Sequence, residues 1–259
     1  MPELCDVEGF RRYLARFATG RRIEWVLVAD PPLVRNASPQ ALGRALAGQR
    51  FARPGRHGKW LIAPAGGPEL LLHFGMTGRL IWSADERDRH RHDRVVFRLR
   101  GGELRYRNMR RFGGVWLARS AAERRELLAP LGPDAMTVDA GSLREILAGR
   151  RRGMKSALMD QELIAGLGNL LSDEILWRAR IDPRRRADEL TARRVARLHE
   201  AMVGVLRAGN RRGRVPPERG WLTGARDRRD ARCPRCDTAL RRATIAGRTT
   251  VWCPRCQRR

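Results

Sequence analysis

Lysine is almost absent from this chain of 259 residues, which contains only Lys59 and Lys155 among its 54 basic residues. Arginine therefore occupies nearly every basic position. A lysine ammonium is compact, can lose its proton and can point at a single oxygen, which a guanidinium cannot do. The two lysines are therefore candidate functional residues, with chance retention as the alternative explanation.

Long apolar runs are absent as well. No stretch approaches the roughly 18 apolar residues that span a bilayer, which argues against a membrane protein. The beginning of the sequence does not read as a secretory signal, and no repeat of fixed period is visible. We therefore expect a protein of the reducing cytoplasm, with 42% hydrophobic residues to build its core.

Acidic residues are scarce, since 28 of them face 54 basic residues and leave a formal charge of +26. A polyphosphate is the expected partner, because counterion release makes its binding to a basic surface favourable and dependent on salt. A purely solvated basic face and an acidic membrane surface are the alternatives. The charge thus favours nucleic acid without implying sequence specificity.

Cysteine is confined to one position near the start and four near the end of the chain. The last four form two Cys-x-x-Cys pairs in an arginine-rich segment, a spacing at which four thiolates close a tetrahedral zinc site. Two disulfides are the alternative, which the expected cytoplasmic location disfavours. With all four sulfurs used as ligands, one structural Zn²⁺ is predicted, and Arg248 between the pairs is a candidate phosphate contact. The predicted ligands are Cys233, Cys236, Cys253 and Cys256.

The first half of the chain combines one helix with short strands. Apolar residues at helical spacing predict an amphipathic helix over residues 3–18. Glycine and proline then punctuate short apolar segments, which predicts a β-sandwich or barrel. The expected strands are Ile23 to Val28, Leu70 to His73, Val95 to Leu99, Glu103 to Tyr106 and Val115 to Leu117.

Residues 142–208 are expected to be mostly helical. Ser142 is a candidate cap for a first helix, and the patterns at 170–181 and 189–208 predict two more. The Gly-rich turn at 164–169 ends at Asn169, which is able to cap the next helix and to face a phosphate, although such a turn is usually only a turn. Residues 209–231, dense in arginine and containing two prolines, are expected to be a mobile linker.

The chain begins Met1-Pro2-Glu3. Methionine before a small residue is commonly removed, which would expose the secondary amine of Pro2. An α-amino group titrates near pH 8, so part of it is unprotonated at neutral pH. Pro2 is therefore a plausible nucleophile for a sugar aldehyde carbon, and Glu3 beside it is able to move protons.

In combination, these segments resemble the formamidopyrimidine-DNA glycosylase and endonuclease VIII family of bifunctional base-excision enzymes. The resemblance covers essentially the whole chain and rests on several motifs in a fixed order. They are Met1-Pro2-Glu3-Leu4, Gly58-Lys59, the His73 to Gly78 segment, Arg110-Arg111-Phe112-Gly113, Leu131-Gly132-Pro133, Leu158 to Gln161, Gly166 to Asn169 followed by Asp173 to Leu176, and the Thr249 to Gln257 ending.

The resemblance implies an α+β fold of three parts. These are an N-terminal catalytic β-sandwich with an N-terminal helix (residues 1–135), a helix-two-turns-helix DNA-binding domain (136–225) and a four-cysteine zinc finger (226–259). Damaged double-stranded DNA would lie in the cleft between domains, with the lesion turned out of the stack. A monomer in a bacterial cytoplasm, associated with the nucleoid, is expected.

The resemblance also implies residue roles. Pro2 would attack C1′, Glu3 would act as acid and base, and Lys59 would contact phosphate or assist proton transfer near the sugar. Release of the base would leave a Schiff base that drives strand cleavage by elimination. Met76, Arg110 and Phe112 match residues that fill the vacated space, although the first and last suit a core and Arg110 a plain surface. Lys155, Asn169 and Arg248 match phosphate contacts.

Some positions depart from the family pattern. Cys5-Asp6 follows the opening motif, which brings a thiol near the proposed site, and Asn108-Met109 replaces the usual Asp-Pro before the Arg-Arg-Phe segment. The segment before the zinc finger lacks the portion with which many 8-oxoguanine-specific members cover the flipped base. The lesion therefore stays open among 8-oxoguanine, formamidopyrimidines, oxidised pyrimidines and abasic sites.

Two other classes of function remain open at this point. One is a lesion-binding or abasic-site-binding protein on the same scaffold with weak or lost catalysis. The other is an arginine-rich, zinc-containing binder associated with the ribosome or with transcription, which the cysteine-rich tail alone would permit.

Overall fold

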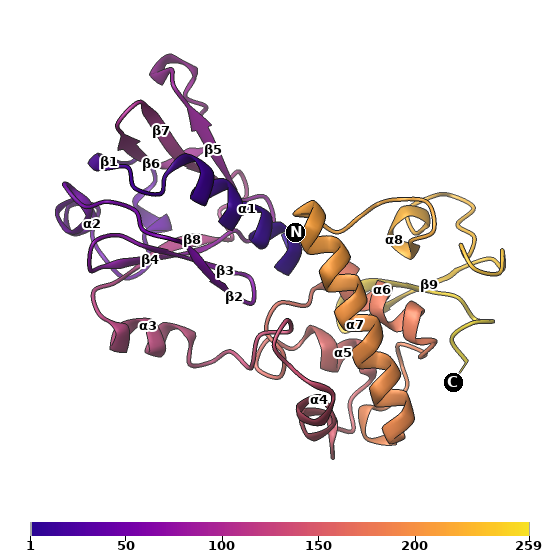
Figure 1. The fold of residues 1–259 in the computed structure, drawn as a ribbon. Helices are drawn as coiled ribbons and strands as arrows, with labels where there is room; N and C mark the ends of the chain where they lie inside the picture. Colours follow the sequence, from indigo (N-terminus) through magenta and orange to yellow (C-terminus); the bar gives the residue numbers. More distant parts are fainter. Residues whose placement is uncertain (1, 259) are drawn as a thin grey trace. The chain divides into compact units, whose positions relative to one another are not determined.

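A computed structural model describes residues 2–258, which divide into two compact units. Pro2 and residues 6–130 form the first unit, and residues 3–5 and 131–258 form the second. Figure 1 shows most of the strands in the N-terminal half of the chain and most of the helices in the C-terminal half. The expected α+β fold is confirmed, while the three proposed domain boundaries remain a prediction.

The first unit is a sandwich of two antiparallel four-stranded sheets, so the sandwich is correct and the barrel is not. One sheet has the order β1 (Ile23–Val28), β6 (Asp93–Leu99), β7 (Gly102–Arg107), β5 (Arg79–Ser83). The other has the order β2 (Gly55–His57), β3 (Trp60–Pro64), β4 (Glu69–His73), β8 (Gly114–Ala118).

The sandwich core is built from apolar side chains of both sheets, because alternate strand residues point to one face. Five strands lie where the sequence predicts them, within two residues at each end. The strands β2, β3 and β5 were not predicted, since their segments are short or mixed in polarity. Core residues include Phe51, Leu61, Leu72, Phe97, Tyr106 and Val115.

Three helices accompany the strands of the first unit, and two of them begin at a capping serine. The predicted N-terminal helix is α1 (Leu4–Phe17), whose Val7 and Leu14 enter the sandwich core. The helices α2 (Pro39–Leu46) and α3 (Ala121–Leu128) begin after Ser38 and Ser120, whose hydroxyls accept backbone N–H bonds. Short 3₁₀ turns lie at Pro31–Leu33, Glu86–Asp88 and, in the second unit, Ala187–Glu189.

The second unit contains α4 (Ala140–Leu147), α5 (Met154–Met159), α6 (Asn169–Ala179), α7 (Ala192–Arg212) and α8 (Leu222–Ala225). Two capping predictions are wrong. Asp139, not Ser142, caps α4, because the Asp139 carboxylate accepts the N–H of residue 142 at 2.7 Å. Gly168, not Asn169, is the N-cap of α6, and it has no side chain to offer.

The mobile linker predicted over residues 209–231 is also wrong. Its first residues complete α7, which ends at Arg212 and is capped by Gly213 with a φ of +66°. The rest folds back onto α6: Leu222 is fully buried, and the Thr223 N–H donates to the Glu174 carboxylate at 3.2 Å. The prolines and arginines suggested disorder, but buried hydrogen bonds anchor the segment.

The C-terminal segment forms a two-stranded hairpin of β9 (Arg241–Ile245) and β10 (Arg248–Trp252), flanked by the two cysteine pairs. A small core joins this hairpin to α6 and α8 through Trp177, Leu222 and Val251. Within residues 2–258, no helix combines the length and the apolar character needed to cross a membrane.

Candidate active site and nucleic-acid interface

Glu3 is buried and fixed at the start of α6. Its carboxylate accepts backbone N–H bonds from Gly168 and Leu171 at 3.0 Å each and from Leu170 at 2.7 Å. A helix N-terminus leaves such N–H groups without partners inside the helix and favours a negative charge. The first turn of α6 thus holds a candidate acid/base residue in one orientation, although 165 residues separate Glu3 from Gly168.

The Gly-rich turn makes this close approach possible. A Cβ atom on Gly168 would lie 2.4 Å from the Glu3 carboxyl carbon, and one on Gly166 would lie 2.5 Å from a methyl group of Leu4. Gly166 also has a φ of +116°, which an L side chain rarely adopts. The absence of side chains at these glycines therefore allows Glu3 and Leu4 to pack against the turn, which is more than a simple connection between helices.

Pro2 is partly buried and directly precedes Glu3. The expected removal of Met1 concerns a residue outside the described range.

Lys59 lies in the tight turn of the β2–β3 hairpin, where His57 pairs with Trp60 and leaves Gly58-Lys59 as the two loop residues. Gly58 has a φ of +54°, as such turns require. Burial, and to a smaller extent the Lys59 charge, lowers the pKa of His73 to about 4. His73 is therefore neutral at pH 7.

Met76, Arg110 and Phe112 lie on two loops of the first unit, and none of them is a core residue. Met76 is 38% exposed and Phe112 is 60% exposed. The Arg110 guanidinium stands 5.0 Å from the centre of the Phe112 ring. Large apolar side chains this exposed suggest a surface that meets a partner.

Asn108 joins these two loops, although its departure from the family pattern raised doubt about their geometry. Its buried side chain accepts the N–H of Arg111 at 3.0 Å and the hydroxyl of Thr77 at 3.3 Å, and it donates to the Tyr106 hydroxyl at 2.9 Å. The Thr77 hydroxyl in turn accepts the Arg110 N–H at 3.0 Å. The amide therefore orders the loop that follows it.

The same two loops approach closely at glycines. A Cβ atom on Gly75, whose φ is +58°, would lie 2.6 Å from the backbone of Phe112 and Gly113. A Cβ atom on Gly113 would lie 2.1 Å from the carbonyl oxygen of His73. Backbone packing therefore sets the separation of the Met76 and Phe112 side chains.

The phosphate contact predicted for Lys155 needs correction. Its side chain is 0% exposed, and its Nζ donates to the backbone oxygen of Asn169 at 2.7 Å and to the Asp173 carboxylate at 2.5 Å. An ammonium with no exposed surface cannot reach a phosphate in this conformation. Burial lowers the pKa of Lys155 and raises the pKa of Asp173, and the attraction between the two opposes both shifts.

Asn169 and Arg248 lie close together at the start of α6. The Asn169 amide donates to the backbone oxygen of Thr249 at 3.0 Å, which ties the helix to the hairpin. Arg248 begins β10 and is exposed. The structure therefore brings together two of the three predicted phosphate contacts beside the first turn of α6, where three N–H groups already bind the Glu3 carboxylate.

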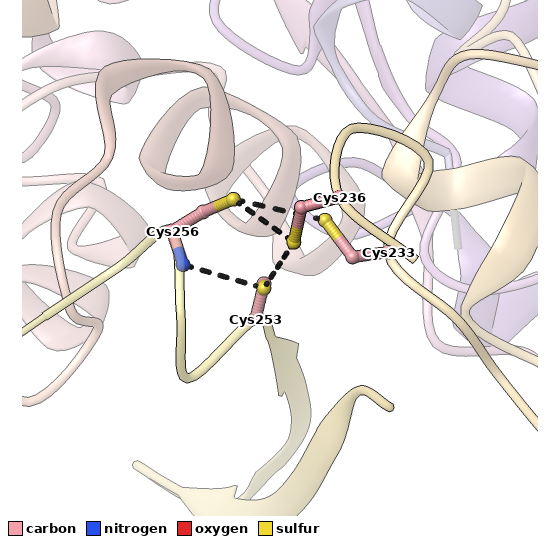
Figure 2. A group of neighbouring side chains, drawn as sticks. All are labelled: Cys233, Cys236, Cys253 and Cys256. Carbon is pink, nitrogen blue, oxygen red and sulfur yellow. Dashed lines mark hydrogen bonds between the residues drawn. The ribbon is translucent and has the colours of Figure 1, made fainter. Parts of the chain in front are cut away.

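The four cysteines form a site that fits zinc. Their sulfur atoms all lie within 4.8 Å of one another, and three pairs are separated by 3.4, 3.5 and 3.9 Å. Zn–S bonds of about 2.3 Å in a tetrahedron require sulfur atoms about 3.8 Å apart. Figure 2 shows the side chains converging from the two pairs, and one structural zinc ion accounts for them.

Partners around the sulfurs support a bound cation. The indole N–H of Trp177 donates to the Cys233 sulfur at 3.3 Å, and the Cys256 N–H donates to the Cys253 sulfur at 3.4 Å. Burial raises the pKa of the Cys253 thiol to about 12, whereas the hydrogen bond with Thr238 lowers the pKa of Cys236 to about 6. A bound cation would stabilise both groups as thiolates.

Sequence reasoning missed Asp173 and Arg226 as members of the site. Asp173 accepts from Lys155, from Arg226 at 2.7 Å and from the Val251 N–H at 3.2 Å. Arg226 also donates to the backbone oxygen of Thr249 at 3.0 Å. Asp173 belongs to a motif that the sequence analysis used to identify the family, but no role was predicted for it. Nothing in the arginine-rich segment distinguished Arg226 from its neighbours.

Three family models match consecutive segments of the chain, which correspond to the sandwich, the helical part and the cysteine-rich hairpin. Residues 1–115 match the formamidopyrimidine-DNA glycosylase N-terminal domain, residues 131–215 match the formamidopyrimidine-DNA glycosylase H2TH domain, and residues 232–259 match the zinc finger found in FPG and IleRS. The helix-two-turns-helix and zinc-finger parts expected from the motifs are thereby confirmed, and the class is that of a zinc-finger DNA glycosylase. The chain belongs to the formamidopyrimidine-DNA glycosylase family.

Curated relatives are similar over nearly their whole length. Formamidopyrimidine-DNA glycosylase of Symbiobacterium thermophilum is 40% identical, with 99% of this chain and 89% of the relative covered. That of Moorella thermoacetica is 40% identical, with 99% and 92% covered. These relatives are bacterial.

Solved structures share the fold. A Lactococcus lactis enzyme variant in complex with DNA containing Fapy-dG has a TM-score of 0.92 and 28% identity, and the Lactococcus lactis enzyme bound non-covalently to DNA with an abasic site has a TM-score of 0.90 and 27% identity. All of this chain and all of each structure are covered.

Proposed function

We propose that this chain is a bifunctional DNA glycosylase and abasic-site lyase of bacterial base-excision repair. It acts on damaged double-stranded DNA, with formamidopyrimidines and abasic sites as its substrates. The observation that carries the proposal is the fixed Glu3 carboxylate directly after Pro2, held by three N–H groups at the start of α6.

The chemistry begins at the nitrogen of Pro2 after removal of Met1. Its lone pair attacks C1′ of the damaged nucleotide, the glycosidic bond breaks, and the base leaves with the bonding pair and takes up a proton. Glu3 moves protons on the sugar as acid and base. The ring-opened sugar is then joined to Pro2 as an iminium ion, which is a covalent intermediate.

Strand cleavage follows from the iminium ion. The positive nitrogen makes the C2′ proton acidic, a base removes that proton, and the C3′–O bond breaks with the phosphate as leaving group. Hydrolysis then frees Pro2. The cationic Lys59 in the β2–β3 turn is assigned to a phosphate or to proton transfer near the sugar.

Extrusion of the damaged nucleotide requires that its vacated space be filled. Met76 and Phe112 are exposed enough to enter the stack, and Arg110 stands against the Phe112 ring. The Asn108 hydrogen bonds to the loop hold this group in place.

The second unit supplies contacts to the DNA backbone. Asn169 and Arg248 bind phosphate at the N-terminus of α6, and the zinc ion keeps the hairpin that carries Arg248 folded. Lys155 does not contact DNA; it donates a hydrogen bond to the backbone oxygen of Asn169 and so stabilises the position of that residue. The protein works as a monomer near the nucleoid, with domains bounded at residues 135 and 225.

Borohydride trapping on duplex DNA with one abasic site tests the proposal. The processed protein should form a covalent adduct that disappears in Pro2→Gly and in a variant with an N-terminal extension. Thr19→Ser, at an exposed position, serves as a control that should trap normally. Protein that binds the duplex but never traps would be a lesion-binding protein without catalysis. A panel of single-lesion duplexes then ranks the substrates.

A further inference from the structure

A hollow of about 620 Å³ at the C-terminal end of α6 is lined almost entirely by arginine. Its arginines come from the end of α6, from α7 and from both cysteine pairs, and Cys236 and Cys256 complete the lining. We call this surface the arginine hollow. Its members are Arg180, Arg194, Arg235, Arg255 and Arg258.

Within the part of the chain that the structure describes, the arginines of the hollow form no ion pairs with acidic side chains. Across residues 2–258, no carboxylate lies within 4.0 Å of a guanidinium nitrogen of these five side chains. Two contacts with Trp177 hold Arg235 in place. Its guanidinium donates to the backbone oxygen of Trp177 at 3.2 Å, and the guanidinium carbon lies 4.4 Å from the centre of the Trp177 ring. Like charges at this density repel, so an external anion would relieve the repulsion.

The first turns of α7 extend the same basic surface. Arg193 and Arg197 line an adjoining hollow of about 680 Å³ together with Arg194, and Glu200 is the acidic side chain in that lining. Burial and the charges of neighbouring arginines lower the pKa of Arg197. The cationic surface thus continues over two hollows that share Arg194.

The arginine hollow is separate from the proposed phosphate contacts of the second unit. Asn169 and Arg248 lie at the N-terminus of α6, whereas Arg180 follows its last residue. The 11 residues of the helix place these two ends roughly 16 Å apart at 1.5 Å per residue. A helix that points its N-terminus at one phosphate directs its other end away from it.

We propose that the arginine hollow is a second binding site for the phosphate backbone of duplex DNA, occupied while a lesion duplex is bound elsewhere. A polyphosphate needs only closely spaced cations, which the hollow supplies. An acidic peptide would also need apolar anchors, and the hollow offers none beyond the zinc-bound cysteines. The site lets the protein hold two DNA segments and pass between them.

The test measures capture of a second duplex by the full-length, zinc-loaded protein. An immobilised duplex with a stable abasic-site analogue is saturated with protein, and binding of a labelled, undamaged duplex is followed as salt is varied. Three of the five charges of the hollow are removed in the triple variant Arg194→Gln, Arg255→Gln, Arg258→Gln. The control triple variant removes equal charge from exposed positions on α2, α3 and α4 through Arg44→Gln, Arg125→Gln and Arg144→Gln.

Wild type and the control should capture the second duplex equally. The hollow variant should bind it at least about tenfold more weakly, with a slope of log affinity against log salt smaller by about 3, because three phosphate contacts are lost. Binding of the first duplex and the zinc content should stay unchanged. This readout involves no bond cleavage, so it is independent of the proposed catalysis.

Three results would overturn the proposal. The first is equal capture by the hollow variant and wild type, and the second is an equal loss in the control variant, which would mean a general effect of charge. The third is that poly-glutamate binds at the hollow, with loss in the hollow variant, while the second duplex does not bind. That result would make the occupant an acidic polypeptide.

Discussion

Arg226 and Asp173 form a buried ion pair, with 2.7 Å between the guanidinium and the carboxylate. Lys155 contacts the other oxygen of the same carboxylate, and Arg226 and Lys155 each donate to a backbone oxygen, of Thr249 and Asn169 respectively. One carboxylate thus organises the backbone beside both proposed phosphate contacts. Buried charges of this kind are tolerated only when all partners are present.

Asp173→Asn should therefore destabilise the second unit by about 3 kcal/mol, because two buried cations lose their anion. DNA affinity should fall as well, since the backbones of Asn169 and Thr249 lose their support. Urea unfolding and duplex binding measure the two effects. Asp230→Asn, at an exposed position of the same arginine-rich segment, is the matched control and should change stability by less than about 0.5 kcal/mol. Equal effects in both variants would contradict the assigned role.

Gly168→Ala should leave the protein folded and reduce adduct formation by about 100-fold, because a displacement of the reacting groups by about 1 Å has an effect of that order. The added methyl group would sit 2.4 Å from the Glu3 carboxyl carbon and push it away. Gly204→Ala makes the same change inside α7, where a Cβ atom meets nothing within 4 Å, and should keep full activity. Trapping kinetics, with circular dichroism as the check on folding, decide the outcome.

Asn108→Ala should loosen the loop that carries Arg110 and Phe112. The substitution removes the acceptor for the Arg111 N–H and leaves buried groups unpaired, at a cost of about 1 to 3 kcal/mol in stability. Thr77→Val removes one partner of the same amide and should show a smaller effect in the same direction. The readouts are thermal unfolding and affinity for duplex DNA with an abasic site. Unchanged affinity in a folded Asn108→Ala protein would refute the positioning role.

The half-buried, neutral His73 should make the first unit sensitive to mild acid. Its pKa is about 4 in the folded protein and about 6.5 when unfolded, so the unfolded state binds more protons between these values. Stability should therefore be constant above pH 6.5 and should fall by up to roughly 3 kcal/mol as the pH drops towards 4.

His73→Gln checks this pH dependence, because glutamine does not titrate in this range. The variant should lose less stability than wild type between pH 7 and pH 5 in urea unfolding. His90→Gln, at an exposed loop position, serves as the control and should behave like wild type. Identical pH profiles for all three proteins would show that His73 is not the group responsible.

Removal of zinc by a chelator should unfold the C-terminal hairpin and abolish DNA binding. The small core beneath it contains the buried sulfurs of Cys233 and Cys253, which lose their cation. The first unit should stay folded, since none of its described residues is a zinc ligand. Metal analysis, binding and the unfolding curve of the sandwich provide the measurements. DNA affinity that survives complete loss of metal would contradict the role of zinc.

The sequence predicted what depends on local patterns. Alternation and helical spacing located five strands and the N-terminal helix, and cysteine spacing identified the zinc site. The fold class, the family and the zinc ion are confirmed, while the roles of Pro2, Glu3 and Lys59 remain predictions. Interactions between distant residues escaped prediction, such as the capping of α6 by Glu3 and the pairing of Arg226 with Asp173.

The high arginine content was the main reason for two wrong predictions, the mobile linker over residues 209–231 and the phosphate contact of Lys155. It made residues 209–231 look like a solvated linker, although Arg226 is only 3% exposed and Leu222 is fully buried. It also drew attention to Lys155 as a rare amine. In the structure this amine makes a buried contact, in which a compact ammonium fits between the Asp173 carboxylate and the Asn169 carbonyl.

The complete burial of Lys155 leaves Lys59 as the only lysine side chain with solvent access. After removal of Met1, whose α-amine is also primary, reagents selective for primary amines would therefore modify this protein at Lys59 and spare Lys155 while the fold is intact. Labelling of Lys155 would then report local opening of the second unit. The two lysines therefore allow the opening of the second unit to be followed by amine labelling, with Lys59 as the internal reference for complete reaction.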